Sequence, residues 1–351
     1  MKTAVVALTR NGSELAVKIG PPMGADVYLK REFIGPECGS RPEIKAIEGS
    51  FMELAGRLFA GYDALVCIMA CGIAVRAIAP HISDKRTDPA VVVLDEKGRY
   101  AVSLLSGHVG GANDLAEEIA ARIGGTAVIT TSTDVNHVVA FDVFAKRNGC
   151  VIENFKDLKY VSSELVNGSK VGFYTDYEIS GVLPGSIVLR EEGTSQGLRA
   201  AAVLSNRTGI EATEEKVLYI RPRNLILGIG CKRGTPKEQI ESAVDDFMRL
   251  NGRSLLSVRC LATIDLKKDE EGLLEYCRDR KLDLCIIERG RVEAVEGGFT
   301  CSPFVKEKTG VGSVAEPCAV MAGSRAKLIC GKTAYRGITL ALAEEEKEFK
   351  L

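Results

Sequence analysis

The chain has 351 residues, of which 46% are hydrophobic and 26% are charged, and its formal net charge at pH 7 is −1. This length suits two or three domains, and the composition is ordinary for a soluble globular protein. A nearly neutral chain argues against a broad nucleic-acid-binding surface, while a local basic pocket is still compatible with it.

The N-terminal apolar run, residues 4–8, is too short for the core of a secretory signal, and no run approaches the length of a membrane span. We therefore expect a cytoplasmic protein whose 11 cysteines are reduced thiols. Cys67 and Cys71 lie four positions apart, but no second pair or nearby histidine completes a zinc site. The sequence predicts no protein-bound metal.

The first third of the chain predicts alternating strands and helices. Strands are expected at residues 2–9, 27–29, 64–70, 91–94, 101–105 and 127–129. Helices are expected at residues 13–19, 51–59 and 114–123, although the pattern at 13–19 also fits a strand. Such alternation is typical of an α/β domain with a parallel sheet.

A glycine-rich loop, Ser-Gly-His-Val-Gly-Gly-Ala-Asn at 106–113, separates a predicted strand from a helix that Asn113 or Asp114 is expected to cap. Glycines let a ligand approach the backbone, and the N–H groups of a helix start attract anions. His108 is the side chain of this loop that can exchange protons near neutral pH. The glycine spacing fits neither a dinucleotide fingerprint nor a P-loop. The loop is therefore a binding site with one acid/base candidate, or simply a tight turn with a surface histidine.

Two more polar loops follow predicted strands. Residues 72–76 lead into a helix that carries Arg76, and residues 130–134 read Thr-Thr-Ser-Thr-Asp. A solvated helix charge and a helix cap would explain them equally well. However, the carboxyl ends of strands in an open α/β sheet are where ligands bind. We therefore expect the loops at 72–76, 106–113 and 130–134 to share one edge of one sheet.

The rest of the chain predicts two further modules. Residues 136–221 mix short strands with Gly and Pro turns and indicate a smaller mixed module, which ends in a linker at 221–223. Residues 222–351 indicate a second α/β domain, and its charged end, 344–351, is expected to fray. The predicted domains are thus 1–135, 136–221 and 222–351.

The second α/β domain repeats the strand, loop and helix pattern. Strands are expected at residues 225–227, 258–262, 284–287, 327–330 and 337–342, and helices at 272–280 and 318–322. The loop 228–236, Gly-Ile-Gly-Cys-Lys-Arg-Gly-Thr-Pro, is rich in backbone donors and positive charge, and Thr235 is its predicted helix cap. Lys267 and Glu270 fit a solvated helix start, and Glu316 before Pro317 fits an ordinary cap.

Taken in order, these motifs resemble the CbiG family of cobalamin biosynthesis. In the N-terminal part the resemblance rests on Gly-Ile-Ala-Val-Arg at 72–76, Lys85 with Asp88-Pro89, the loop at 106–113 and the loop at 130–134. In the C-terminal part it rests on Gly-Ile-Gly-Cys at 228–231, Ala-Thr-Ile-Asp-Leu-Lys at 262–267 and Thr-Gly-Val-Gly-Ser-Val-Ala-Glu at 309–316.

The resemblance implies a cobalt-precorrin-5A hydrolase of the anaerobic pathway. Such an enzyme opens the ring A lactone and releases acetaldehyde to give cobalt-precorrin-5B. It implies no cofactor beyond the cobalt that the substrate carries, no nucleic-acid or membrane partner, and at most transient contacts with neighbouring pathway enzymes. The alternatives are a non-catalytic carrier of the corrinoid intermediate and a nucleotide- or sugar-phosphate-binding α/β protein.

Candidate site residues follow from these motifs and from the proton transfers and oxyanion charge of lactone hydrolysis. The candidate catalytic residues are His108 as the acid/base, Asp134 as the group that orients it, and Glu316. The candidate substrate-binding residues are Gly72, Arg76, Lys85, Gly107, Gly110, Gly111, Asn113, Thr130, Thr131, Gly230, Cys231, Lys232, Thr263 and Lys267.

Overall fold

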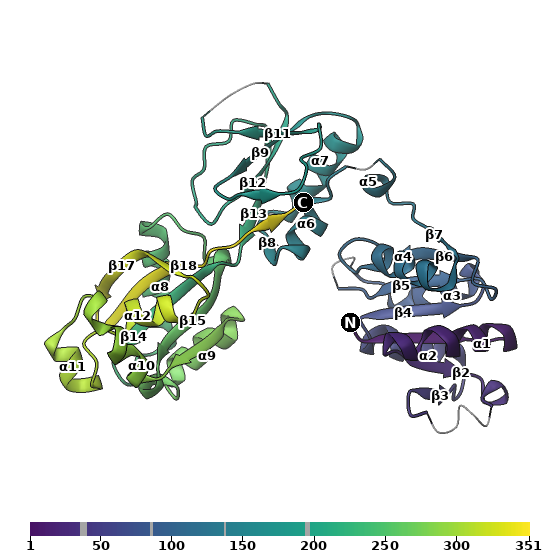
Figure 1. Cartoon of the computed structure of the whole chain (residues 1–351), viewed down its shortest axis with the longest axis horizontal. Coiled ribbons are helices and arrows are strands. Elements are labelled where there is room, and N and C mark those ends of the chain that lie inside the picture. Colours follow the sequence, from purple (N-terminus) through teal and green to yellow (C-terminus); the bar gives the residue numbers. More distant parts are fainter. Residues whose placement is uncertain (36–40, 85–86, 137, 194–196) are drawn as a thin grey trace. The chain divides into compact units, whose positions relative to one another are not determined.

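A computed structural model describes residues 1–35, 41–84, 87–136, 138–193 and 197–351 (Figure 1). The chain forms two compact units, Met1–Val143 and Phe144–Leu351. Each unit is described by itself below. Among the helices of the described ranges, none has the length and apolar character that a membrane span requires.

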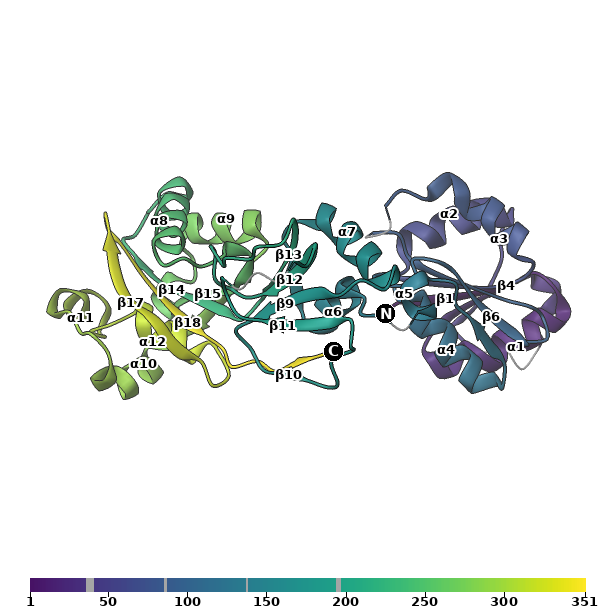
Figure 2. The ribbon, with the colours of Figure 1, turned by 90° about the horizontal axis from the view of Figure 1, so that it is seen from above.

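The N-terminal unit is a seven-stranded sheet in the order β3-β2-β1-β4-β5-β6-β7, with helices on both faces (Figure 2). Its strands are β1 Thr3–Ala7, β2 Asp26–Leu29, β3 Ile44–Ala46, β4 Ala64–Ile68, β5 Ala90–Leu94, β6 Tyr100–Leu105 and β7 Thr126–Val128. Its helices are α1 Arg10–Ile19, α2 Phe51–Gly61, α3 Cys71–Ile78, α4 Ala112–Ile123, α5 Ser132–Val135 and the start of α6 Phe141–Arg147. The predicted α/β fold with a largely parallel sheet is confirmed.

Two apolar layers hold this sheet between its helices. Val5 and Val66 point to the face that α1 and α4 cover, where Ile119 is fully buried. Their neighbours along the strands, such as Leu65, point to the opposite face, which Leu54 and other residues of α2 and α3 cover. Side chains alternate between the two faces of a strand, so a strand covered on both sides must be apolar throughout.

Strand direction decides where the polar loops lie. All neighbouring strands of this sheet are parallel except β5 and β6, which are antiparallel with Val91 opposite Leu105. β6 and β7 are again parallel. The carboxyl ends of β6 and β7 therefore lie at the edge opposite to that of β4. The expectation that three loops share one edge is wrong: 106–113 and 130–134 share one, and 72–76 lies at the other.

The helix starts differ from the predicted ones. Helix α1 begins at Arg10, where Thr9 Oγ1 accepts a hydrogen bond from the Gly12 N–H, which rules out the strand alternative. Helix α4 is preceded by Gly111 with φ 94° and has no side-chain cap, so Asn113 and Asp114 do not cap it. Glycine fits that position because it reaches positive φ without strain.

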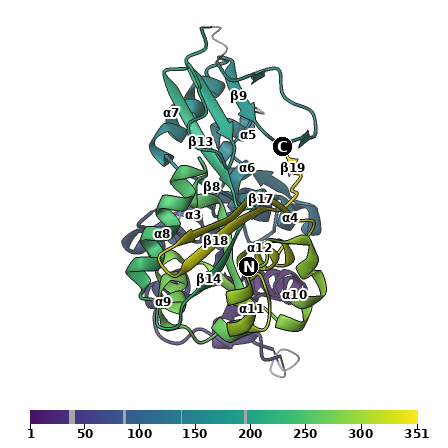
Figure 3. The same ribbon diagram turned by 90° about the vertical axis from the view of Figure 1, so that its left-hand side faces the viewer.

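The C-terminal unit contains two five-stranded sheets, in the orders β11-β9-β12-β13-β8 and β16-β15-β14-β18-β17, and a small β10-β19 pair (Figure 3). The strands are β8 Cys150–Ile152, β9 Val171–Thr175, β10 Ile179–Ser180, β11 Ile187–Arg190, β12 Ala200–Leu204, β13 Lys216–Pro222, β14 Leu225–Cys231, β15 Val258–Ile264, β16 Asp283–Ile287, β17 Lys327–Tyr335, β18 Ile338–Glu344 and β19 Phe349–Lys350. The helices are α7 Phe155–Val166, α8 Lys237–Leu250, α9 Glu271–Arg280, α10 Arg289–Val295, α11 Pro303–Thr309 and α12 Ala315–Met321.

The predicted linker at 221–223 is buried structure. Arg221 is only 3% exposed, and its guanidinium donates to the backbone carbonyls of Ser205 and Arg207 at 3.0 and 2.6 Å. Pro222 ends β13, and β14 begins only three residues later at Leu225. The linker expectation is therefore wrong, although the domain bounds 1–135, 136–221 and 222–351 stay a prediction.

Two further expectations fail in this unit. Helix α8 begins at Lys237 after Pro236, while the Thr235 hydroxyl donates to the Lys232 carbonyl at 2.7 Å, so Thr235 is not its cap. The end of the chain is not frayed. Residues 349–350 form β19, and Asn148 exchanges two hydrogen bonds with the Lys350 backbone at 2.8 and 2.9 Å.

Replacing Phe349 by Ala should lower the stability of the C-terminal unit by about 3–5 kcal/mol, the usual cost of emptying a buried aromatic site. Phe349 is fully buried, with its ring centre 4.8 Å from that of Tyr177. Urea denaturation followed by circular dichroism measures the change. Lys350→Ala is the control, since its exposed side chain is lost while its backbone bonds stay. Equal stabilities of the two variants would contradict the docked tail.

Candidate active site

The loop after β6 is held in a closed turn that presents His108. The Ser106 and Gly107 carbonyls accept the N–H groups of Ala112 and Asn113 at 3.2 and 3.0 Å. A Cβ on Gly110 would lie 2.3 Å from the Ser106 Cβ, so only glycine permits this closure. Gly110 thus shapes the loop, and the predicted substrate-binding role of its glycines stays a prediction.

His108 lies between two carboxylates. Its Nε2 is 2.7 Å from Asp134 Oδ2 and 2.9 Å from the Thr133 hydroxyl. Its Nδ1 is 3.6 Å from Asp142 Oδ2. The side chain of His108 is 15% exposed, that of Asp142 11% and that of Asp134 40%. Asp134 is therefore the carboxylate of this group that solvent or a ligand reaches most readily.

Asn113 joins the two loops of this edge. Its side-chain amide donates to Thr131 Oγ1 at 3.1 Å and to Asp134 Oδ2 at 3.0 Å. Its carbonyl oxygen accepts from the Ser103 hydroxyl at 2.6 Å. The structure thus brings together four of the predicted residues, His108, Asn113, Thr131 and Asp134. Thr130, at the start of the same loop, is exposed.

The two carboxylates favour the charged imidazolium. The nearby Asp142 carboxylate raises the pKa of His108, and Asp134 adds to the effect, and together they outweigh the opposing influence of burial. Burial by itself would raise the pKa of Asp142, but the adjacent His108 ring and its positive charge lower it overall. This raised pKa suits His108 to donate a proton.

Asp142 is the residue that the sequence reasoning missed. It lies in the first turn of α6, where an acidic residue is common because it interacts favourably with the helix dipole. Nothing in the local pattern distinguishes it from such a residue. Only the folded chain shows that it faces the histidine of a loop more than 30 positions earlier.

Arg76, another N-terminal candidate, does not join this group. Arg76 is exposed, donates to the Gly72 carbonyl at 3.1 Å and lies at the opposite edge of the sheet. Lys85 falls outside the described residues.

A second polar cluster lies where β14 and β15 end. Glu270 is 6% exposed and accepts hydrogen bonds from the Gly234 N–H and from Lys267 Nζ, both at 2.9 Å. Burial would raise the pKa of Glu270, but these two partners lower it overall. Thr263, fully buried, donates to the Ile229 carbonyl at 2.7 Å. Two of the predicted binding residues, Lys267 and Thr263, are thus occupied by contacts within the protein.

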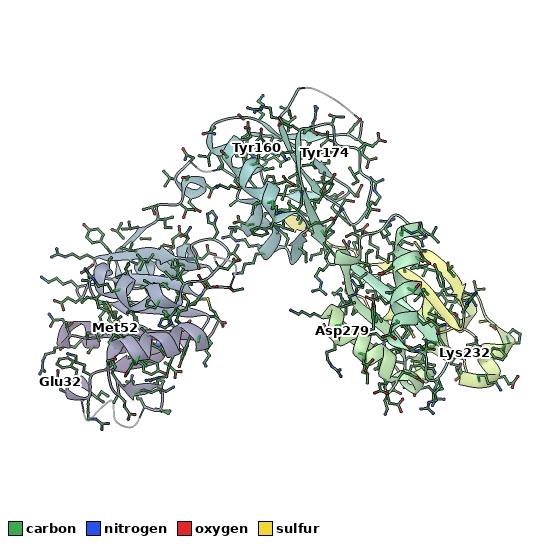
Figure 4. The ribbon with its side chains drawn as sticks, turned by 180° about the vertical axis from the view of Figure 1, so that it is seen from behind. Glu32, Met52, Tyr160, Tyr174, Lys232 and Asp279 are labelled. Carbon is green, nitrogen blue, oxygen red and sulfur yellow. The ribbon has the colours of Figure 1, made fainter. Side chains whose placement is uncertain are left out.

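The other predicted residues at this edge also have internal contacts. Lys232, labelled in Figure 4, directly follows β14. Lys232 itself donates its backbone N–H to the Gly337 carbonyl at 2.9 Å, and its aliphatic chain lies against Gly337. Burial raises the pKa of the Cys231 thiol, which favours its neutral form, and Gly230 lies beside Val314.

Glu316 links three segments of the C-terminal unit. It is 4% exposed, and its two oxygens accept the backbone N–H groups of Thr300 and Lys332, each at 2.9 Å. Both carboxylate oxygens are therefore engaged by the backbone. This geometry favours a structural role, and the predicted catalytic role of Glu316 stays untested.

Within the described ranges, no three His, Cys, Asp or Glu side chains are arranged as ligands of a metal ion.

Comparison with known proteins decides the family. The models described as Cobalamin synthesis G N-terminal, Cobalamin biosynthesis central region and Cobalamin synthesis G C-terminus match residues 53–134, 139–222 and 225–343. A cobalt-precorrin-5A hydrolase from Priestia megaterium is 34% identical over 356 residues, covering 97% of this chain and 94% of the relative. The chain belongs to the CbiG family.

Two more relatives of this CbiG-family chain span its length. A cobalt-precorrin-5A hydrolase from Salmonella typhimurium is 32% identical over 345 residues, covering 97% of this chain and 96% of the relative. A probable cobalt-precorrin-5A hydrolase from Methanocaldococcus jannaschii is 28% identical over 356 residues, covering 98% of this chain and 99% of the relative. The family resemblance stated from the motifs is thus confirmed.

Replacing His108 by Gln should destabilise the N-terminal unit most strongly in mildly acidic solution, by about 1–3 kcal/mol, the range for hydrogen bonds to charged groups. Because folding raises the pKa of His108, the stabilisation of the fold by His108 is complete below its ordinary pKa of 6.5. This stabilisation is lost as pH rises through the raised pKa. Because folding lowers the pKa of Asp142, the stabilisation of the fold by Asp142 is complete above its ordinary pKa of 3.8. This stabilisation is lost as pH falls through the lowered pKa. Urea denaturation of both proteins across this pH range measures the difference, and a difference that grows toward alkaline pH would contradict the ion-pair assignment.

Proposed function

We propose that this chain is a cobalt-precorrin-5A hydrolase, which opens the ring A lactone and releases acetaldehyde to give cobalt-precorrin-5B. The observation that carries the proposal is the His108 imidazole held between Asp134 and Asp142 in a glycine loop. Full-length similarity to relatives named for this activity supports it. Cobalt arrives with the substrate in this proposal, and no further cofactor takes part.

The chemistry requires both a proton acceptor and a proton donor. Water adds to the lactone carbonyl and loses a proton, and the ester oxygen leaves and gains one. The freed alcohol then loses its O–H proton and departs as acetaldehyde as its carbon–carbon bond to the macrocycle breaks, and the electron pair of that bond stays with the macrocycle. Asp134, the more exposed carboxylate, suits the acceptance of a proton from water, and the His108 imidazolium suits donation to oxygen. The proposal therefore assigns His108 the acid role and Asp134 the base role.

A non-catalytic carrier of the same intermediate is not favoured. A carrier needs contacts with the macrocycle but no acid/base group, whereas this site couples a histidine to two carboxylates. The names of the full-length relatives also describe a hydrolase.

His108→Gln should lower turnover of cobalt-precorrin-5A by roughly 10²–10⁴-fold, the usual contribution of a general acid–base group. Acetaldehyde released under anaerobic conditions measures turnover, and binding of the substrate measures affinity. His81→Gln is the matched control, because His81 lies against Gly56 and Phe59, away from the loop at 106–113.

Three outcomes are decisive. Lost turnover with retained affinity supports the acid role of His108. Native turnover in His108→Gln overturns that role. No acetaldehyde from the unmodified protein, despite tight substrate binding, overturns the hydrolase proposal in favour of a carrier.

A further inference from the structure

An open cavity of about 610 Å³ lies in the C-terminal unit, between the end of α6 and the last strand, β19. Its lining comes from residues 147–149 and from residues 347, 348, 350 and 351, all within the unit Phe144–Leu351. The described lining includes no residue of the acid/base group around His108. A volume of this size is within the range of small-molecule sites.

Basic side chains dominate the charge of this cavity. Arg147, Lys347 and Lys350 line it, and Glu348 is the acidic side chain of the described lining. Most small-molecule sites are lined by apolar and aromatic side chains, so this lining indicates a polar, negatively charged ligand instead. Guanidinium and ammonium groups are common protein partners of carboxylate and phosphate oxygens.

Asn148 holds the two segments of the lining together. It is 8% exposed, and its amide donates to the Phe144 and Lys350 carbonyls at 2.9 and 2.8 Å. Its Oδ1 accepts the Lys350 N–H at 2.9 Å. The backbone that carries Arg147 and Lys350 is therefore fixed before a ligand arrives, which lowers the ordering cost of binding.

Lys347 lies over Gly149, which has no side chain to fill the space beside the ammonium group. A Cβ built on Gly149 would lie 3.4 Å from Lys347 Nζ, and Nζ is 5.6 Å from the centre of the buried Phe349 ring. The charge of Lys347 also opposes the burial that raises the pKa of Cys150 to about 11. These contacts place the Lys347 charge at the wall of the cavity that residues 147–149 form.

We propose that this cavity is a binding site for a small polyanion, a molecule that carries two or more carboxylate or phosphate groups. Three cationic side chains from two segments suit several anionic groups, because each group can meet a cation of its own. The planar guanidinium of Arg147 suits a bidentate contact, and the two lysines act as point charges. This inference goes beyond the proposed function and does not depend on it.

Isothermal titration calorimetry of the whole chain at low salt tests the site with two probes, citrate for carboxylates and pyrophosphate for phosphates. We expect saturable binding of at least one probe, which weakens as potassium chloride is added because salt screens the charges. The probe that binds more tightly identifies which of the two anionic groups the site prefers. Absence of saturable binding of both probes would overturn the inference.

Charge variants locate the binding. Lys347→Gln should weaken it by about 10-fold, the effect of losing one charge-assisted contact. Glu348→Gln should strengthen it by about 2–5-fold, because it removes the acidic side chain that repels the ligand. Lys327→Gln is the matched control, since it removes an exposed lysine of β17 that does not line the cavity, and it should leave the affinity unchanged. Circular dichroism checks that each variant is folded.

The outcomes separate a built site from general attraction. Equal weakening by Lys347→Gln and Lys327→Gln would show that the probe responds only to the charge of the whole protein, and would overturn the inference. Weaker binding by a folded Glu348→Gln protein would contradict the assigned electrostatics and overturn it as well. Acetaldehyde release is not measured here, so the proposed function and this inference stand or fall separately.

Discussion

The antiparallel pairing of β5 with β6 is the constraint on which the candidate active site depends. It turns β6, and with it the parallel strand β7, against the direction of β4 and β5. The loops after β6 and β7 consequently meet at one edge, where Asn113 bonds to both Thr131 and Asp134. A fully parallel sheet would have placed the loop at 72–76 beside them instead.

The site itself rests on a balance of charge. One imidazolium between two carboxylates leaves a group with a net negative charge, which is tolerated because Asp134 is 40% exposed and also accepts from Asn113. Burial of Asp142 without a cationic partner would be costly. His108 and Asp142 therefore stabilise each other, and each holds the other in the form that proton donation requires.

The C-terminal unit shows how polar groups join two sheets. Glu344 Oε1 accepts from Tyr177, Asn206 and Asn224 at 3.0, 2.8 and 3.0 Å. Asn206 follows β12 of one sheet, whereas Asn224 precedes β14 of the other. Buried polar groups of this kind must all be satisfied, so cutting the chain beside Asn224 would leave several unpaired. This explains why the segment at 221–224 is not a free linker.

The sequence by itself determined the α/β class, the family and the loop that carries His108, because apolar periodicity and local motifs are properties of neighbouring residues. It also placed Asp134 in the same site, because three polar loops were each expected to follow a strand at one edge. The sheet confirms this for the loops 106–113 and 130–134 but not for 72–76. The tertiary structure decided the direction of β6 and β7, the partner of His108 on α6 and the backbone contacts of Glu316. The physical reason is that these features depend on residues distant in the chain, and an acidic residue in a first helical turn has the same local pattern whether it faces water or a histidine.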